Sequence, residues 1–285
     1  MIDYYAVVVL YNKKMYDSIT IKNLLQINDK SFHIIVLDNS TEAYVKENKN
    51  SFISDSVTYY SMGGNVGLSK AYNFALTILK EKCGEDIVIW FDDDTPVDQE
   101  YINCLKKNGE NRIYDVFVPI IYGQNGVIYS PNEIGWLKGK YISEPSQEIN
   151  KNKFNAINSC LAVRLKIYNN YRYDERLFMD CVDTKLFDDF RRMNVKFCVL
   201  PVKVHQNFFQ HGDDKDMNKY WRRFEIRIRD TLYYSQLGGY KKKMSGYIKV
   251  IGWSIIYGMK LKSCKFSYLC LKQIFTLREK NESLF

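Results

Sequence analysis

Apolar runs alternate with one-sided helical patterns through the first half of the chain. Four runs are rich in β-branched and aromatic residues and have the length of buried strands: residues 5–10, 32–37, 57–60 and 87–91. Residues 15–27 and the segment that opens at residue 68 carry apolar side chains along one side of a helix. Strands and helices in alternation, with short connections, predict an α/β fold with a mostly parallel central sheet flanked by helices.

The second half of the chain is less regular. The pattern predicts strands at residues 116–122, 127–129, 154–163, 196–200 and 202–205. It predicts one helix that follows residues 173–183 and ends at about residue 192, and three more at 217–237, 241–260 and 265–280. Residues 130–153 and 206–216 are polar and are expected to form loops. We expect residues 154–163 to cross the front of the sheet as one strand.

The composition indicates a globular protein and bears on its cellular compartment. The 285 residues suffice for one large α/β domain with an appendage, and 46% hydrophobic with 26% charged residues excludes a disordered chain. The seven cysteines have no metal-binding spacing, which is typical of reduced thiols in a cytosolic protein. The first residues enter a strand without a basic segment, so we expect no signal peptide, and no uncharged apolar run reaches the ~18 residues that span a bilayer.

The net charge of +8 belongs to the end of the chain. Residues 240–285 hold 10 Lys or Arg and 2 Glu, which leaves 31 basic and 31 acidic residues before them. The basic residues are interleaved with Trp253, Ile255, Tyr257 and other apolar side chains at helical spacing. Basic amphipathic helices of this kind favour an anionic membrane surface. The alternative is a helical pair that packs on the domain or on another subunit of a homo-oligomer.

Three consecutive carboxylates, Asp92, Asp93 and Asp94, follow the apolar run at 87–91. Adjacent acids repel one another unless a cation lies among them. Mg²⁺ and Mn²⁺ bind carboxylate oxygens and keep positions open for phosphate oxygens. The stretch therefore fits a divalent-metal site or, alternatively, a solvated acidic loop at the end of a strand.

Other polar residues follow the neighbouring strands. Tyr11, Asp38 and Asn65 stand at or near the carboxyl ends of the first three predicted strands. Ligands of parallel α/β sheets lie beyond these ends, so we expect these residues and the three carboxylates to line one crevice.

With these elements in order, the chain resembles a family-2 glycosyltransferase of the GT-A fold. The resemblance covers roughly residues 4–235 and rests on the ordered motifs VVVLYN, VLDNS, GGNVGLSKAYNFAL, WFDDDT, NSCLAV, ERLFMDCVDTKL and VKVH. The pattern is similar to bacterial rhamnosyl- and galactofuranosyl-transferases that build cell-surface polysaccharides. It implies metal-dependent, inverting transfer of a sugar from a UDP- or dTDP-sugar to an acceptor hydroxyl, with Mg²⁺ or Mn²⁺.

The resemblance also implies a domain division. Residues 1–237 would form the catalytic domain, with a nucleotide-binding half at 1–122 and an acceptor-binding half at 123–237. Residues 238–285 would be a separate basic helical tail. Because the acceptors of this family are commonly lipid-linked, the resemblance implies a cytoplasmic enzyme bound peripherally to the inner face of the cytoplasmic membrane.

Donor-binding roles are carried over by position. Asp92 and Asp94 match the DxD pair: Asp92 would meet the ribose or the metal, and Asp94 the metal. Asp93 could touch the donor sugar, the metal or neither. Asp38 would accept the N3–H of uracil or thymine, although it could instead cap a helix. Further nucleotide contacts are implied for Tyr11, which would stack on the base, and for the turn at Gly64, Asn65 and Gly67, with Lys70 or Asn73 beside it.

Acceptor-side roles come from the later motifs. Asp183 matches the catalytic base that deprotonates the acceptor hydroxyl, with Asp180 as second choice; helix capping is the structural alternative. His205 matches a histidine on the metal. Asn158, Asp180 and Arg229 are candidate diphosphate or acceptor contacts. One departure is Lys185, where family members often carry an acid.

Two other classes of function use the same features. A nucleotidyltransferase or phosphatase could employ the acid cluster for phosphoryl chemistry, although Pro96 stands where a haloacid-dehalogenase motif has Thr or Val. A non-catalytic, membrane-attached scaffold would bind neither nucleotide nor metal. The arginines of residues 222–229 lie among aromatic residues, yet they fit a diphosphate or a solvated helix face, and we expect no nucleic-acid partner.

Overall fold

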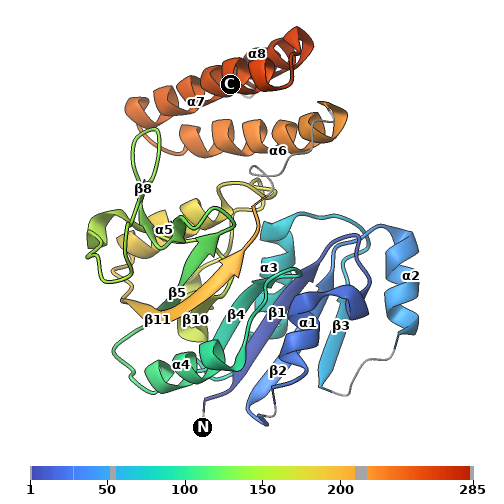
Figure 1. Cartoon of the computed structure of the whole chain (residues 1–285), viewed down its shortest axis with the longest axis vertical. Coiled ribbons are helices and arrows are strands. Elements are labelled where there is room, and N and C mark those ends of the chain that lie inside the picture. The colour runs from blue at the N-terminus through green and yellow to red at the C-terminus, as the bar shows by residue number, and fades with distance from the viewer. Residues whose placement is uncertain (1, 28, 52–55, 209–216, 283–285) are drawn as a thin grey trace.

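The computed structural model describes residues 2–27, 29–51, 56–208 and 217–282 (Figure 1). Within them, the main sheet has eight strands in the order β11-β5-β10-β4-β1-β2-β3, with β6 beside β5. Its strands are β1 (Tyr4–Leu10), β2 (Phe32–Asp38), β3 (Val57–Ser61), β4 (Ile87–Asp92), β5 (Val116–Gly123), β6 (Ile128–Ser130), β10 (Leu161–Arg164) and β11 (Phe197–Gln206). The predicted α/β fold with a mostly parallel sheet is confirmed.

Strand register aligns the carboxyl ends at the centre of the sheet. Strand β1 is parallel to β2 on one side and to β4 on the other. Leu10 lies opposite Asp38, and Val9 lies opposite Asp92. The last residues of three strands therefore meet at one edge, as the pattern of strand ends predicted.

Helices cover both faces of the sheet. Helices α1 (Ile19–Leu24) and α4 (Gln99–Gly109) pack on one face, over a core that includes Ala6, Val8 and Phe91. Helices α3 (Leu68–Ile78) and α5 (Val182–Arg192) pack on the other face. Helix α2 (Glu42–Asn50) follows β2. Burial on both faces explains why the central strands read as continuous apolar runs.

Three details differ from the predicted elements. Residues 154–163 form two strands: β9 (Phe154–Asn155) joins β7 (Asn132–Glu133) and β8 (Lys140–Tyr141) in a small sheet, and β10 enters the main sheet antiparallel between β4 and β5. Strand β11 is continuous across Pro201, with a register shift where two strands were expected. Helix α4 was not expected, because its apolar positions are diluted by polar residues. Short pairings and dilute patterns carry weak periodic signals.

The last three helices form one layer above the sheet (Figure 1). Helices α6 (Met217–Gln236), α7 (Tyr240–Lys260) and α8 (Cys264–Glu282) share a core of Phe224, Ile228, Val250 and Phe266. The boundary expected at residue 238 therefore separates helices that pack together. Among the described residues, no helix is both long and apolar enough to span a membrane.

Candidate active site

Asp92 ends the buried strand β4 and is held from two sides. Gln206, at the end of β11, donates a hydrogen bond from Nε2 to Asp92 Oδ2 at 2.9 Å. The turn at 158–160 lies against the same strand end, where the Cys160 N–H donates to the Trp90 carbonyl. Burial, and then the charge of Asp94, raise the pKa of Asp92 to about 6. Asp92 is thus a carboxylate whose charge the protein leaves partly uncompensated.

Asp93 points to the loop that follows the first strand. Its Oδ2 accepts the Tyr11 N–H at 3.2 Å, and its Oδ1 pairs with Lys13. The side chain is 14% exposed. Asp93 therefore joins the loops after β1 and β4, and its contact with a donor sugar stays a prediction.

Asp94 is an exposed residue at the mouth of the site, although its carboxyl group is partly shielded from solvent. This desolvation, and then the charge of Asp93, raise the pKa of Asp94. Tyr11, directly after β1, is 47% exposed. These two residues keep the accessibility that their expected roles require.

His205 does not join the carboxylates. It is exposed and stacks on Tyr122 at 5.6 Å, whereas the next residue, Gln206, is buried and bonds Asp92. Successive side chains of a strand point to opposite faces, so Gln206 occupies the inward position expected for His205. In the described part of the chain, no three His, Cys, Asp or Glu side chains are grouped to hold a metal ion.

Asp38 is a buried structural residue. Its Oδ1 accepts the Ser40 N–H at 3.0 Å, and its Oδ2 accepts hydrogen bonds from Asn48 at 2.8 Å and the Tyr59 hydroxyl at 2.7 Å. The side chain is fully buried, so it presents no oxygen to the crevice. The expected contact with a nucleobase is corrected: Asp38 fixes the loop that starts at Asn39.

Two glycines of the turn before α3 are required for different structural reasons. Gly64 has φ +130° and faces open space, as a turn that admits a ligand would. Gly67 has φ +86°, and an added Cβ would lie 2.7 Å from the Phe178 ring. Gly67 therefore allows the close approach of the loop before α5, and the Leu68 N–H donates to the Phe178 carbonyl at 2.6 Å.

Other residues of this turn serve as clamps. The exposed Asn65 accepts hydrogen bonds from Asn39 and from the Gly67 N–H. The side chain of Asn73 bonds the backbone N–H and carbonyl of Tyr173. Lys70 is exposed. The nucleotide contacts expected of Asn65 and Lys70 stay predictions.

A single carboxylate on α6 holds the loop before α5. Asp230 Oδ2 accepts the backbone N–H groups of Phe178, Met179 and Asp180 at 3.1, 2.8 and 2.9 Å. The Asp230 side chain is fully buried. Its other oxygen accepts from Arg229 at 3.3 Å. This arrangement fixes the residues immediately before the candidate base.

Asp180 and Asp183 differ in their partners. Both oxygens of Asp180 pair with the Arg223 guanidinium. Asp183, in the first turn of α5, accepts the Thr184 N–H at 2.6 Å and makes no ion pair within the described residues. Burial, opposed by this hydrogen bond, raises the pKa of Asp183 to about 6. Asp183 is the carboxylate that is free to take a proton.

Tyr72 connects the two halves of the site. It is buried, and its pKa is raised well above 10 by burial and then by the charges of Asp92 and Asp183. Its hydroxyl also interacts with Asn158, whose Oδ1 is buried without a hydrogen-bond partner in the described part of the chain. The end of β4 and the start of α5 therefore lie around one phenol.

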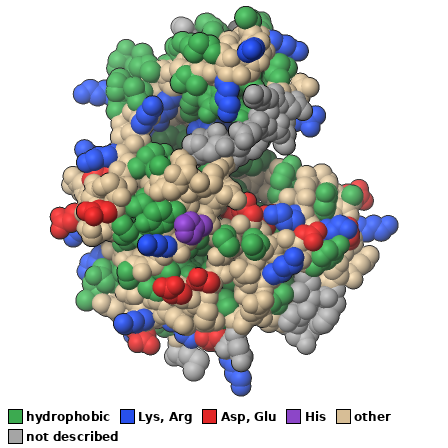
Figure 2. Space-filling model, viewed as in Figure 1, with side chains coloured by type: hydrophobic (Ala, Val, Ile, Leu, Met, Phe, Trp, Pro, Cys, Tyr) green, Lys and Arg blue, Asp and Glu red, His purple; other side chains and the backbone are tan. Residues whose placement is uncertain are grey.

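A groove of about 860 Å³ opens beside Asp183, between the start of α5 and the helical layer. We name it the α5–α7 groove; its lining includes Tyr141, Asp180, Asp183, Lys249, Trp253 and Ile256. The β7–β8 loop reaches the start of α7, where the Trp136 indole donates to the Lys241 carbonyl at 2.9 Å (Figure 1). The space-filling view shows the molecule hollowed beneath the helical layer (Figure 2).

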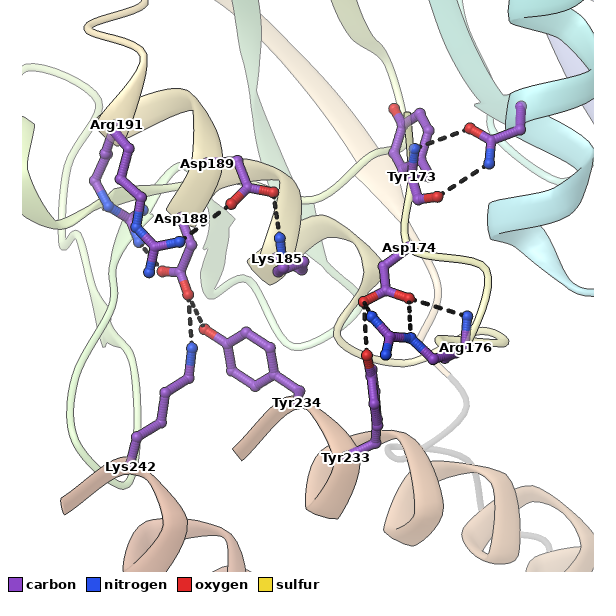
Figure 3. A network of polar contacts seen from close by, with 12 residues as sticks. Tyr173, Asp174, Arg176, Lys185, Asp188, Asp189, Arg191, Tyr233, Tyr234 and Lys242 are labelled. Carbon is purple, nitrogen blue, oxygen red and sulfur yellow. Dashed lines mark hydrogen bonds and ion pairs between the residues drawn. The ribbon is translucent and has the colours of Figure 1, made fainter. Parts of the chain in front are cut away.

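Helix α5 is tied to this layer by charge pairs (Figure 3). Asp188 accepts from the Tyr234 hydroxyl and the Lys242 ammonium, both at 2.7 Å, and pairs with Arg191. Lys185 pairs with Asp189 one turn later, so its cation is neutralised within the helix. These contacts tie α5 to both α6 and α7.

Comparisons with known proteins identify the fold. Residues 5–172, more than half of the chain, match the model of the family described as glycosyl transferase family 2. The chain belongs to this family. Family-2 glycosyltransferases with the GT-A fold have the same mostly parallel sheet flanked by helices.

Relatives agree with this assignment. The family-2 chain is 25% identical over 190 residues to the dTDP-rhamnosyl transferase RfbF of Shigella flexneri, a match that covers 64% of this chain and 60% of that protein. It is similar to the crystal structure of GalNAc-T7 with UDP, GalNAc and Mn²⁺ (TM-score 0.58, 13% identity, 92% of this chain and 57% of that one). It is also similar to S. aureus TarS 1-349 in complex with UDP (TM-score 0.50, 16% identity, 90% and 75%).

Sequence reasoning missed four residues that shape this family-2 site: Lys13, Gln206, Arg223 and Asp230. For Gln206 a signal exists, because Val202 and Val204 are in phase with it and His205 is not. For the other three, the partner lies 43 to 80 residues away along the chain, and no local pattern marks the pairing. Most of the loop expected at residues 206–216, namely residues 209–216, lies outside the described residues.

We predict that Asp183→Asn stabilises the protein at pH 8 and leaves it unchanged near pH 4. A carboxyl whose pKa rises on folding from 3.8 to about 6 lowers stability progressively between these two pH values; the full cost is present above about pH 6 and is absent when the group is protonated in both states. The gain should be roughly 1–3 kcal/mol, since one pKa unit corresponds to about 1.4 kcal/mol. Urea denaturation at both pH values measures it, with the exposed Asp17→Asn as control. A variant less stable than the wild type at pH 8 would contradict the assignment.

Proposed function

We propose that this protein is a metal-dependent, inverting glycosyltransferase that acts in bacterial cell-surface polysaccharide synthesis. It would move a sugar from a dTDP- or UDP-sugar to a hydroxyl of a growing, lipid-linked glycan. The observation that carries the proposal is that Asp92, at the end of β4, and Asp183, at the start of α5, both have a raised pKa and both act electrostatically on the buried phenol of Tyr72.

The donor set at the end of β4 fits a hard divalent cation. Asp92 and Asp94 supply carboxylate oxygens, and Gln206 Oε1 is a buried oxygen without a partner among the described residues. Mg²⁺ is commonly held by one or two carboxylates together with substrate phosphates. When bound, Mg²⁺ or Mn²⁺ would neutralise charge on the departing nucleoside diphosphate.

The nucleotide would lie over the ends of β1 and β2. Tyr11 has an exposed ring for stacking on the base, and Gly64 leaves open space beside the turn. The relative's name gives dTDP-rhamnose as the first donor to test, and two structural neighbours were crystallised with UDP. Arg229, which lies over the Phe178 ring at 5.4 Å, is a candidate diphosphate contact.

Asp183 would act as the general base. A pKa of about 6 keeps it ionised at neutral pH while leaving it basic enough to accept the proton of an attacking hydroxyl. The ion pair of Asp180 with Arg223 makes Asp180 a positioning residue in this scheme. One base suffices for direct displacement with inversion, because the acceptor oxygen attacks as the diphosphate leaves.

The outer face of the helical layer would dock on an anionic membrane. Ile251, Ile255 and Met259 form an exposed stripe at four-residue spacing on α7, and Tyr268 and Phe275 are exposed on α8. Hydrophobic and basic side chains lie together on the visible face of this layer (Figure 2). Apolar insertion and basic residues worth ~1 kcal/mol each would bring the enzyme to a lipid-linked acceptor.

Asp94→Ala should abolish Mn²⁺-dependent binding of dTDP and UDP, because it removes an accessible metal ligand. Titration calorimetry with and without Mn²⁺ measures the effect, with Asp93→Asn as a matched control that alters a clamp and keeps both metal carboxylates. Unchanged affinity of the Asp94 variant in the presence of Mn²⁺ would exclude the metal role.

Asp183→Asn should bind the donor normally and lose at least ~10³-fold in transfer, since only the base is removed. Transfer of labelled sugar from dTDP-rhamnose and UDP-sugars into isolated bacterial membranes provides the assay, and intact nucleoside diphosphate as the product separates this reaction from phosphoryl chemistry. Retained turnover would assign the base to another residue.

Ile255→Glu should weaken binding to phosphatidylglycerol vesicles severalfold while leaving the fold intact, because the side chain is 56% exposed. Sedimentation with vesicles measures this, and Ile113→Glu, at an equally exposed site in another part of the molecule, serves as control. This point change is preferable to deleting 240–285, which would expose the shared core of the helical layer. Equal partitioning of both variants would leave the layer as a packing element.

A further inference from the structure

Lys249 is a cation that the fold leaves without a partner. It lies half-buried on α7 and, within the described residues, makes no hydrogen bond or ion pair. It lines both the α5–α7 groove and an adjoining groove of about 730 Å³ that continues past Arg191 and Lys242. Burial lowers the pKa of Lys249, and repulsion from Arg227 and Lys242 adds to this. An unpaired, desolvated cation needs a counter-ion to be favourable there.

The neighbouring cations are already engaged. Lys242 bonds Asp188 and lies over the Tyr234 ring at 3.6 Å. Arg227 lies over the Trp253 ring at 4.6 Å. Asp188 neutralises Lys242, whereas the charge of Arg227 adds to that of Lys249, so this part of the groove favours an anionic ligand.

The side of α7 that faces the two grooves changes along its length from polar and charged to apolar side chains. Ser245, Lys249, Gly252, Trp253 and Ile256 all line one or both grooves, and they recur at helical spacing. A Cβ on Gly252 would meet nothing within 4 Å, so the groove is open at that point. Ile248 and Ile256 lie at its edge and are exposed, next to the apolar outer stripe of α7. The groove thus passes from the carboxylates through a cation to an apolar wall.

We infer that the α5–α7 groove contains an anion subsite in which Lys249 binds a phosphate group carried by the acceptor. The inference rests on the proposed function, because it takes Asp183 as the residue that meets the acceptor hydroxyl. A phosphate carries up to two negative charges and accepts hydrogen bonds from a compact ammonium group. Trp253 and Ile256 would contact the apolar part attached to that phosphate.

The acceptor, and not the bilayer, is the favoured source of the phosphate. Lys249 is half-buried inside the groove that Asp183 lines, whereas lipid headgroups would meet the exposed lysines of the outer face, such as Lys243. A subsite at this depth selects the acceptor by its charge, in addition to the sugar that bears the hydroxyl.

The test is calorimetric titration of the full chain with octyl phosphate and with octyl glucoside, in EDTA so that no metal-bound site contributes. Wild type should bind octyl phosphate more tightly than octyl glucoside. Lys249→Met should lose at least tenfold in octyl phosphate affinity, Lys249→Arg should retain most of it, and the matched Lys243→Met should be unchanged. Gly252→Phe, which fills open space and keeps the helix, should block both probes.

Three outcomes would overturn the inference: equal octyl phosphate affinity of Lys249→Met and wild type, equal binding of the charged and neutral probes, or undisturbed binding in a folded Gly252→Phe protein. Loss of phosphatidylglycerol vesicle binding in Lys249→Met, with octyl phosphate binding unchanged, would also overturn it by assigning the lysine to the bilayer. Failure of the proposed function can be distinguished from failure of this inference. If the proposed function failed, the protein would show no Mn²⁺-dependent nucleotide binding, while octyl phosphate binding would still depend on Lys249.

Discussion

The carboxylate of Asp230 is the interaction on which the acceptor side of the site depends. Its burial is unfavourable by itself, and the three backbone N–H groups of Phe178, Met179 and Asp180, together with Arg229, compensate for it. The loop they belong to has no regular secondary structure to satisfy its donors, and it turns into α5 through Cys181 at φ +61°. Because Asp230 lies on α6, the helical layer is part of the active site's framework.

The acidic residues of the site fall into two physical groups. Asp38, Asp93, Asp180, Asp188 and Asp230 are saturated with hydrogen bonds or ion pairs and serve as clamps. Asp92, Asp94 and Asp183 have pKa values raised by burial and by like charges, with less compensation. Burial also raises the pKa of Asp230, but three backbone N–H groups and Arg229 compensate its charge. Uncompensated charge lowers stability, and proteins retain it where a ligand or a proton transfer makes use of it. The chemistry is therefore expected at the second group, although both groups have the same residue type.

Much of the donor half could be predicted from the sequence, because its information is local. Apolar runs mark β1, β2 and β4, parallel pairing aligns their ends, and Asp92 must then lie at the crevice. The contacts that the sequence does not predict arise where a partner distant in sequence decides the outcome. Asp38 is buried by Asn48 and Tyr59, Asp93 is engaged by Lys13, and Gly67 serves the approach of Phe178. His205 is a case of another kind, since a one-residue change of phase in a strand moves a side chain to the opposite face.

The extent of the family match follows the same division and bears on specificity. The family model ends at residue 172, so it includes Tyr11, Asp92 and Asp94 but stops before Asp183 and the whole helical layer. The part that would bind a nucleotide and metal is what this chain has in common with its family. Most of the groove beside Asp183 is built from α5, α6 and α7, outside that match, and Lys249 and the apolar wall come from α7; Tyr129 and residues 137–139 and 141, inside the match, complete the lining. The choice of acceptor would therefore depend mainly on the helical layer, whose last two helices are identified from their basic composition alone only as a tail.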